Sequence, residues 1–212
     1  MNKGLSEKVI KRLTLYHFIL TECEQTGLEV ISSPRIAELL NIDNSQVRKD
    51  IKFVNHVGKC KIGYDVKALK KCIEDTLGFK KTKDAFIIGA GNIGTALLKY
   101  DDLKDYGLNI LALFDNNPLK VGMTLNSKEV FHLSKLPNLV QRLNVEIAIL
   151  TVPKEVAQAC AEFLVESGIK YIWNFSPCVL KVDKNIRVWN ENLIGNFLQF
   201  VAEDKVINDE RN

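Results

Sequence analysis

The stretch AFIIGAGNIGTALL at residues 85–98 decides the fold, because it joins a short apolar run to a glycine-rich turn and then to a helix. The apolar residues Ala85–Ile88 predict a buried strand. In the GxGxxG motif that follows, one glycine permits the tight turn, one lets the backbone approach a pyrophosphate, and one lets the helix pack closely on the strand. Strand, turn and helix together predict the first unit of a Rossmann domain, a fold that binds dinucleotides.

An acidic residue follows this motif at the expected distance. Asp115 stands directly after Ile110–Phe114, which predicts a second strand, and the acid of a dinucleotide site lies about 20 residues beyond the glycines. A carboxylate at this place accepts hydrogen bonds from the ribose hydroxyls and repels a 2′-phosphate. We therefore expect NAD(H) rather than NADP(H) as the ligand, a preference that the nearby Lys120 would soften.

Strands and helices alternate from there to about residue 190. Further strands are predicted at Val145–Val152, Tyr171–Phe175 and Ile186–Trp189, with a helix at Val156–Ser167, and this alternation is typical of a parallel sheet with helical crossovers. Ligands bind beyond the carboxyl ends of such strands. Residues at two of these strand ends are therefore candidates for the nicotinamide half of a pocket: Thr151, Pro153, Asn174 and Phe175.

The first 78 residues indicate short helices joined by turns. Helices are predicted at residues 7–24, Arg35–Leu40 and Gln46–Val54, the last capped by Asp43 or Ser45. The second and third of these resemble a helix-turn-helix. The glycines and basic residues of Gly58–Tyr64 predict a small hairpin or wing, a linking helix follows at residues 65–77, and the chain closes with a helix at about Leu193–Val206.

Positive charge gathers in the same half of the chain. Between residues 45 and 71, only Asp50 and Asp65 oppose the basic residues Arg48, Lys49, Lys52, Lys59, Lys61, Lys67, Lys70 and Lys71. Such a stretch is either a nucleic-acid footprint or a solvated helix face.

Composition argues against several other classes. No apolar run is long enough to span a bilayer and no signal core precedes the first helix, which predicts a cytoplasmic protein. The five cysteines form no CxxC pair and the three histidines are scattered, so we expect reduced thiols and no metal site. His132 is assigned to a short segment between helices, in a structural role. No acid or base suited to hydride transfer stands out, and a dinucleotide domain joined to a possible DNA-binding module suggests a sensor rather than an enzyme.

Several specific stretches occur in order across both halves of the chain: Ser32-Ser33, Ile36–Leu40, Gln46–Asp50, Gly63–Val66, Gly89–Gly94 with Ala96–Leu98 and Tyr100, Phe114-Asp115, Lys120–Gly122 and Asn174–Pro177. With these stretches, the chain resembles the Rex family of redox-sensing transcriptional repressors along nearly its whole length.

The resemblance implies an α/β homodimer that catalyses no reaction. Each chain would have a winged-helix DNA-binding domain (1–78), a Rossmann domain that binds NAD(H) (79–190) and a C-terminal dimerisation helix and tail (191–212), the helix swapped onto its partner. Such repressors bind operator DNA when NADH is scarce and release it when NADH binds. Two-fold symmetry then predicts a palindromic operator.

The resemblance also assigns residues to each ligand. The expected NAD(H) residues are Gly89, Ala90, Gly91, Asn92, Ile93, Gly94, Tyr100, Asp115 and Lys120, with the four strand-end residues named above. The expected DNA contacts are Ser45, Gln46, Arg48, Lys49 and Lys52 on or at the recognition helix, and Lys59, Lys61 and Tyr64 on or beside the wing.

The chain departs from the family pattern at two coupled places. Phe18 stands where the family usually has an arginine, and Asn192 where it usually has an aspartate. In the family these charges can pair across the domain interface and help to couple NADH to the DNA domain. Because both charges are absent, neither is left without its partner, but the switch is then either weakened or rebuilt.

The sequence of the predicted wing also departs from the family pattern, since family members commonly carry more glycines and an arginine in the wing. Altered DNA preference, or loss of DNA binding, is the consequence to test. The alternative function is therefore a Rex-like dinucleotide-binding protein that acts through protein partners. Cys60, on the predicted wing, is a candidate for a thiol that makes DNA binding sensitive to oxidation.

Overall fold

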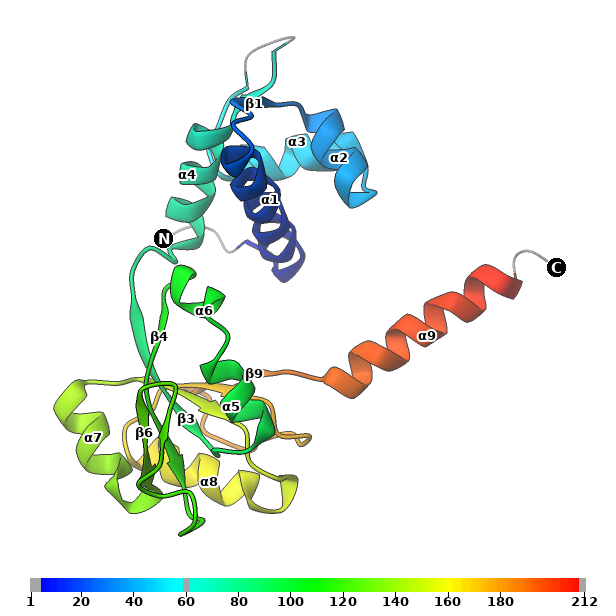
Figure 1. Cartoon of the computed structure of the whole chain (residues 1–212). Helices are drawn as coiled ribbons and strands as arrows, with labels where there is room; N and C mark the ends of the chain where they lie inside the picture. Colours follow the sequence, from blue (N-terminus) through cyan, green and yellow to red (C-terminus); the bar gives the residue numbers. More distant parts are fainter. Residues whose placement is uncertain (1–4, 59–61, 210–212) are drawn as a thin grey trace. The chain divides into compact units, whose positions relative to one another are not determined.

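The computed structural model of the chain describes residues 5–58 and 62–209, with side chains up to Ala202. It divides into two compact units, one that ends at Lys81 and one that begins at Thr82 (Figure 1). The predicted boundary lies after residue 78, with the C-terminal helix as a separate part, whereas the compact units divide after Lys81 and the second unit includes that helix.

The described residues of unit 1 form four helices and one short pair of strands. In chain order they are α1 (Glu7–Gln25), β1 (Val30–Ile31), α2 (Ser33–Leu40), α3 (Asn44–Phe53), β2 (Tyr64–Asp65) and α4 (Val66–Leu77). β1 and β2 pair antiparallel, with Val30 opposite Asp65 and Ile31 opposite Tyr64. This pair closes the base of the predicted wing, while Lys59, Cys60 and Lys61 lie outside the described residues.

Capping residues define the helix-turn-helix. The Ser32 hydroxyl accepts a hydrogen bond from the N–H of Arg35 at the start of α2, and the Asp43 carboxylate accepts one from Ser45 at the start of α3, so Asp43 and not Ser45 is the cap. Asn41 ends α2 in the left-handed region, with φ of 50°. That conformation suits asparagine and turns the chain directly into α3.

One buried carboxylate joins α3 to α1. Asp50 is fully buried. It accepts hydrogen bonds from Arg12 Nε (2.6 Å) and Nη2 (2.9 Å), from the Tyr16 hydroxyl (2.8 Å) and from Gln46 Nε2 (2.8 Å). Burial raises the pKa of Asp50, but the hydrogen bonds from Arg12, Tyr16 and Gln46 outweigh it, and the pKa lies below its ordinary value. The carboxylate is thus held ionised within an apolar core.

Replacement of Asp50 by alanine should destabilise unit 1. Breaking a buried ion pair leaves polar groups unpaired, and since the Arg12 side chain is 23% exposed we expect the lower end of the usual range, about 3 kcal/mol of unfolding free energy. Urea titration followed by far-UV circular dichroism measures it. Tryptophan fluorescence, which reports only unit 2 because both tryptophans lie there, should not change.

The matched control is Glu38→Ala, which removes an exposed ion pair with Arg35 and should cost less than about 0.5 kcal/mol. Equal effects of the two substitutions would contradict the role given to Asp50.

Unit 2 contains a seven-stranded sheet in the order β5-β6-β4-β3-β7-β8-β9. Its strands are β3 (Lys83–Ile88), β4 (Leu108–Asp115), β5 (Thr124–Leu125), β6 (Lys128–His132), β7 (Ile147–Leu150), β8 (Tyr171–Asn174) and β9 (Arg187–Asn190). All neighbouring pairs are parallel except β5 with β6. The six parallel strands follow the order of a dinucleotide-binding Rossmann sheet.

The helices of unit 2 are α5 (Asn92–Leu98), α6 (Asp102–Asp105), a short 3-10 helix, η1 (Leu133–Lys135), α7 (Leu136–Leu143), α8 (Lys154–Glu166) and α9 (Leu193–Asp209). The assignment of His132 to a segment between helices was wrong, because His132 ends β6. β6 was missed since KEVFH shows no continuous apolar run, and its hairpin turn uses Asn126 and Ser127 at positive φ instead of the usual Asn-Gly.

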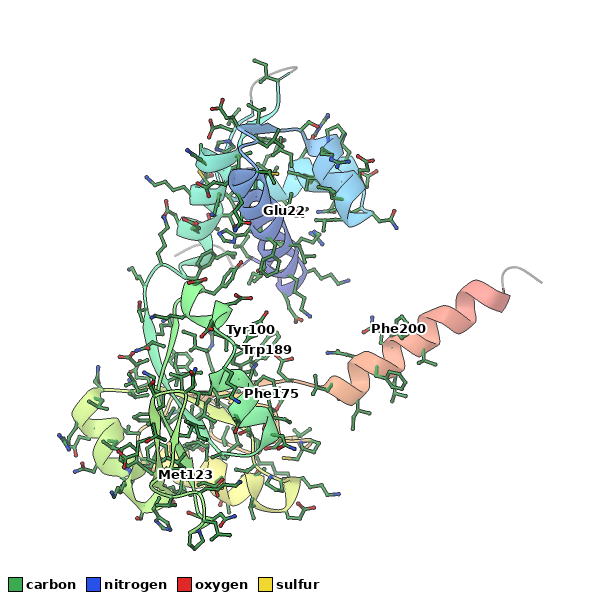
Figure 2. The ribbon with its side chains drawn as sticks, in the orientation of Figure 1. Glu22, Tyr100, Met123, Phe175, Trp189 and Phe200 are labelled. Carbon is green, nitrogen blue, oxygen red and sulfur yellow. The ribbon has the colours of Figure 1, made fainter. Side chains whose placement is uncertain are left out.

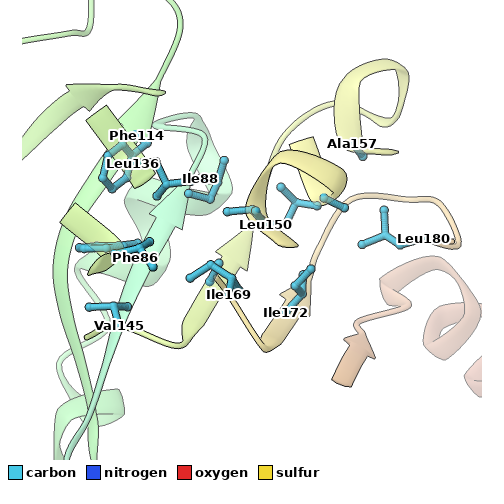
Figure 3. Packing of buried hydrophobic residues seen from close by; sticks show 14 of the residues in the cluster. Phe86, Ile88, Phe114, Leu136, Val145, Leu150, Ala157, Ile169, Ile172 and Leu180 are labelled. Atoms are coloured by element: carbon cyan, nitrogen blue, oxygen red, sulfur yellow. The ribbon is translucent and has the colours of Figure 1, made fainter. Parts of the chain in front are cut away.

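Both faces of the central strand β3 are buried, as is usual for a parallel sheet. Alternate residues along β3 enter different clusters, with Phe86 and Ile88 on one face and Ala85 and Ile87 on the other. The larger cluster joins Phe86 and Ile88 to residues of α7 and α8 (Figure 3). This rigid layer fixes the strand ends that form the site described next. Among the described residues, no helix is long and apolar enough to cross a membrane.

Candidate functional site

A cavity of about 700 Å³ lies at the carboxyl ends of the central strands. β4 and β7 flank β3 on opposite sides, so the strand order reverses at β3. Ligands of open α/β sheets bind at this point, beyond the carboxyl ends of the strands. Most of its walls are apolar, and a few polar groups converge on it. The lining residues are Ile88, Gly89, Gly91, Asn92, Ile93, Phe114, Asp115, Asn116, Asn117, Lys120, Leu133, Thr151, Val152, Pro153, Val156, Cys160, Phe175 and Pro177.

The three motif glycines have different surroundings. Gly89 has φ of +102°, which favours glycine, and a side chain there would meet the Thr151 carbonyl oxygen at 3.0 Å. A Cβ at Gly94 would lie 2.1 Å from the Gly89 carbonyl oxygen, so the helix packs on the turn too closely for any side chain. A Cβ at Gly91 would meet nothing within 4 Å, so the space beside its backbone is open.

Asp115 is organised by the turn itself. Its carboxylate accepts hydrogen bonds from the N–H groups of Ala90 (2.9 Å) and Asn117 (2.8 Å) and from Lys120 Nζ (3.2 Å). Burial raises the pKa of Asp115, but the N–H groups and the Lys120 ammonium outweigh it and hold the pKa below its ordinary value. An ionised acceptor therefore lies beside the glycine turn, as recognition of ribose hydroxyls requires.

Thr151 connects β7 to the turn. Its hydroxyl is within hydrogen-bond distance of the carbonyl oxygens of Ile88 (3.0 Å) and Gly89 (2.8 Å). Pro153 and Phe175 complete this side of the cavity.

Nine of the thirteen predicted dinucleotide residues line the cavity: Gly89, Gly91, Asn92, Ile93, Asp115, Lys120, Thr151, Pro153 and Phe175. Ala90 and Gly94 shape it from behind, through the N–H bonded to Asp115 and the close helix packing.

Two predicted residues are not part of the lining. Tyr100 is 56% exposed and belongs to a separate hollow beside Leu98 and Asn126. Asn174 is fully buried, and its amide donates to the Asn190 side chain (2.8 Å) and the Cys178 carbonyl (3.0 Å). The strand-end pattern could not distinguish a pocket residue from one that fixes the loop behind the pocket.

The prediction also missed lining residues such as Leu133, Val156 and Cys160. Leu133 follows β6, the strand that the sequence did not reveal. Val156 and Cys160 are on α8, where helical periodicity does not show which positions face a cavity.

In unit 1, four of the eight predicted DNA-contact residues form one exposed face of α3. Ser45, Arg48, Lys49 and Lys52 are exposed at helical spacing. Arg48 Nε donates to the Ser33 hydroxyl on α2 at 3.2 Å. Gln46 is half-buried on Asp50, and Tyr64 is half-buried, with its ring close to Gly58. Lys59 and Lys61 cannot be placed, since they lie outside the described residues.

Known proteins match both units. Residues 4–51 match the family model of a putative DNA-binding protein N-terminus, and residues 80–178 match that of a CoA binding domain. The redox-sensing transcriptional repressor Rex of Bacteroides fragilis is 41% identical over 190 residues, 90% of this chain and 86% of the relative. The Rex repressor of Treponema denticola is 42% identical over 188 residues, 89% of this chain and 90% of the relative.

The chain belongs to the Rex family. The resemblance stated from sequence is therefore confirmed, together with the predicted α/β fold.

Solved Rex-family structures match the chain over nearly its full length. The Rex-family repressor RSP aligns with a TM-score of 0.85 and 33% identity, covering 99% of this chain and 100% of that chain. RSP in complex with β-NAD⁺ and operator DNA gives 0.87 and 32%, covering 99% and 98%. RSP in complex with β-NADH gives 0.84 and 34%, covering 97% and 98%.

Alanine substitutions at Gly94 and Gly91 should have different effects on the melting temperature of unit 2. Gly94→Ala places a methyl group against a backbone carbonyl and should lower the melting temperature of unit 2 by roughly 5–10 °C. Gly91→Ala enters open space at an ordinary φ of −87° and should leave it unchanged. Tryptophan fluorescence during heating measures both, and similar melting of the two variants would refute the packing argument.

Proposed function

We propose that the chain is a redox-sensing transcriptional repressor that binds palindromic operator DNA as a homodimer and releases it when NADH binds. The observation that carries this proposal is the pairing, in one Rex-family chain, of a cavity built on GxGxxG and Asp115 with an exposed basic face on α3. It is supported by RSP, which has the same fold and has been solved both with NADH and with NAD⁺ and operator DNA.

The cavity residues account for NAD(H) as the ligand. The open side of Gly91 accepts the pyrophosphate, and the Asp115 carboxylate accepts from the adenosine ribose and disfavours a 2′-phosphate. Lys120 is bonded to Asp115, so part of its charge is already neutralised. Thr151, Pro153 and Phe175 enclose the nicotinamide end.

The α3 face accounts for DNA binding. Arg48, Lys49 and Lys52 supply cations for base edges and phosphates in the major groove. Gln46 directs its amide nitrogen to Asp50, because the ionised carboxylate accepts but does not donate. Gln46 therefore offers its carbonyl oxygen to DNA, an acceptor that suits the amino groups of cytosine or adenine.

The cavity gives no support to catalysis. Within its described lining, the ionisable side chains are Asp115, Lys120 and Cys160. The N–H groups and Lys120 hold the pKa of Asp115 below its ordinary value despite burial, and burial raises the pKa of Cys160. Neither group therefore exchanges protons readily near neutral pH. A sensor that acts on DNA in this way belongs in the cytoplasm.

DNA binding with and without ligand tests the proposal. In fluorescence anisotropy on fragments from upstream of its own gene and of fermentation genes, NADH and not NAD⁺ should release the wild-type chain. Gly91→Ala should bind DNA normally but resist release, because its methyl group occupies the pyrophosphate space. Arg48→Ala should lose about 1–3 kcal/mol of specific affinity, whereas Arg142→Ala, which removes the same charge from α7, should not.

A wild-type chain that binds neither these fragments nor any member of a randomised DNA pool would contradict the proposal. The alternative function, dinucleotide-dependent binding of a protein partner, would then be favoured. A steep loss of binding with added salt separates phosphate contacts on DNA from a merely solvated helix face.

The C-terminal helix accounts for the homodimer. The apolar side chains of α9 from its first residue to Phe200 are exposed, each by 59% or more: Leu193, Ile194, Phe197, Leu198 and Phe200 (Figure 2). Exposure of so many large apolar groups marks an interaction surface. A second copy that covers them, with the helices exchanged, satisfies this surface and gives the two-fold symmetry that a palindromic operator requires.

Phe197→Glu should convert the dimer to a monomer, because it buries a charge in an apolar contact. Sedimentation velocity measures the change. Val179→Glu is the control, since Val179 is apolar, 83% exposed and outside α9. A wild-type chain that sediments as a monomer at micromolar concentration would overturn the dimer.

A further inference from the structure

Both tryptophans of the chain are bonded to one carboxylate. Trp173 Nε1 donates to Glu191 Oε1 at 2.8 Å, and Trp189 Nε1 donates to the same oxygen at 3.1 Å. Trp173 on β8 and Trp189 on β9 are direct partners across the parallel pair, and Glu191 is the first residue after β9. The three side chains form a cluster at the edge of the sheet, here called the Trp–Glu cluster.

One side of the Trp–Glu cluster reaches the dinucleotide cavity. The rings of Trp173 and Phe175 are 4.9 Å apart between centroids, at an angle of 54°, and Phe175 lines the cavity. The N–H of Phe175 is bonded to the Leu150 carbonyl at 2.8 Å, so its backbone is fixed. A ligand ring that enters this end of the cavity would therefore act on the Phe175 ring rather than on its backbone, and the Trp173 ring is in contact with the Phe175 ring.

The other side reaches the start of α9. The N–H of Glu191 donates to the Asn174 carbonyl at 2.8 Å. The next residue, Asn192, caps α9 by accepting from the N–H of Gly195 at 2.8 Å. A Cβ at Gly195 would lie 2.2 Å from the Asn192 amide, so this cap is closely packed. The position of Glu191 thus sets the point from which α9 departs.

We propose that the Trp–Glu cluster transmits occupancy of the nicotinamide end of the cavity to α9, with Glu191 as the positioning residue. The inference rests on the proposed function, because it supplies the path by which NADH changes the dimer. Phe175 and Trp173 are in ring contact, and one carboxylate oxygen holds both indoles. A shift of the Trp173 ring therefore has to move Glu191 or break a hydrogen bond.

The proposed link requires no charge at Phe18 or Asn192. Asn192 serves as the helix cap, and the acidic group at the end of the sheet is the adjacent Glu191. That carboxylate is bonded within its own unit, to Trp173 and Trp189. The link from ligand to α9 is accordingly built inside unit 2.

Glu191→Ala tests the role of the cluster. It should retain NADH affinity within about threefold and ligand-free operator affinity within about threefold, because it removes no cavity or α3 residue. The ratio of operator dissociation constants with and without saturating NADH should fall at least tenfold below that of the wild-type chain. Glu191→Gln, whose amide oxygen still accepts an indole N–H, should stay within threefold of wild type, and the exposed control Glu129→Gln should match wild type.

A spectroscopic signature separates this role from simple stabilisation. With 5-fluorotryptophan incorporated, the full-length chain gives two ¹⁹F resonances, one for each tryptophan. NADH should shift both in the wild-type chain. In Glu191→Ala, the Trp173 resonance should still shift, because it is next to Phe175, whereas the Trp189 resonance should not. Trp189→Phe, which keeps a ring but lacks the indole N–H, should also reduce release by NADH.

The outcomes are distinguishable. Release of Glu191→Ala from operator by NADH to the same extent as wild type would overturn the link alone. A wild-type chain that binds NADH and stays on its operator would overturn the proposed function and the link with it. Should Glu191→Ala fail to fold, Trp189→Phe and the ¹⁹F shifts carry the same test.

Discussion

The contact that the structure of unit 2 depends on is the approach of Gly94 to the carbonyl oxygen of Gly89. It places α5 directly on the turn after β3, with no room for a side chain between them. Thr151 adds a hydroxyl within reach of the same carbonyl and so ties β7 to the turn. The space left beside Gly91 then has fixed walls, and the ionised Asp115 is held at its edge by the N–H of Ala90. A binding site of this kind is formed before its ligand arrives.

The sequence was informative where local chemistry alone sets the structure. The glycines and Asp115 could be placed because a tight turn, a close helix contact and an ionised acceptor each demand one residue type at one spacing. It was uninformative where distant segments meet. β6 pairs with β4 through a strand of mixed polarity, and Asn174 turned away from the cavity to bond Asn190. Neither partner is visible in a local pattern.

Unit 1 shows the same limit for a DNA-binding residue. Gln46 was predicted from its place at the start of the recognition helix, yet its amide lies on Asp50 together with the Arg12 guanidinium and the Tyr16 hydroxyl. The three donors compensate the burial of one carboxylate and join α1 to α3. If Gln46 contacts DNA as proposed, that contact and the stability of the unit depend on one set of hydrogen bonds.

A ligand can shift an equilibrium only by as much as its affinity differs between the two states. The switch therefore needs contacts that respond to the nicotinamide end, since the pyrophosphate and ribose contacts are the same for both redox forms. Phe175, which is proposed to lie at that end, lines the cavity, and its ring neighbour Trp173 is hydrogen-bonded to Glu191 between β9 and α9. Phe18 and Asn192 are both neutral, so neither leaves a buried charge unpaired. The coupling can then be carried by neutral rings and one carboxylate, and a hydrogen bond between them is short-ranged and little screened by salt. A switch built in this way would keep its response to NADH at ionic strengths that weaken an exposed ion pair.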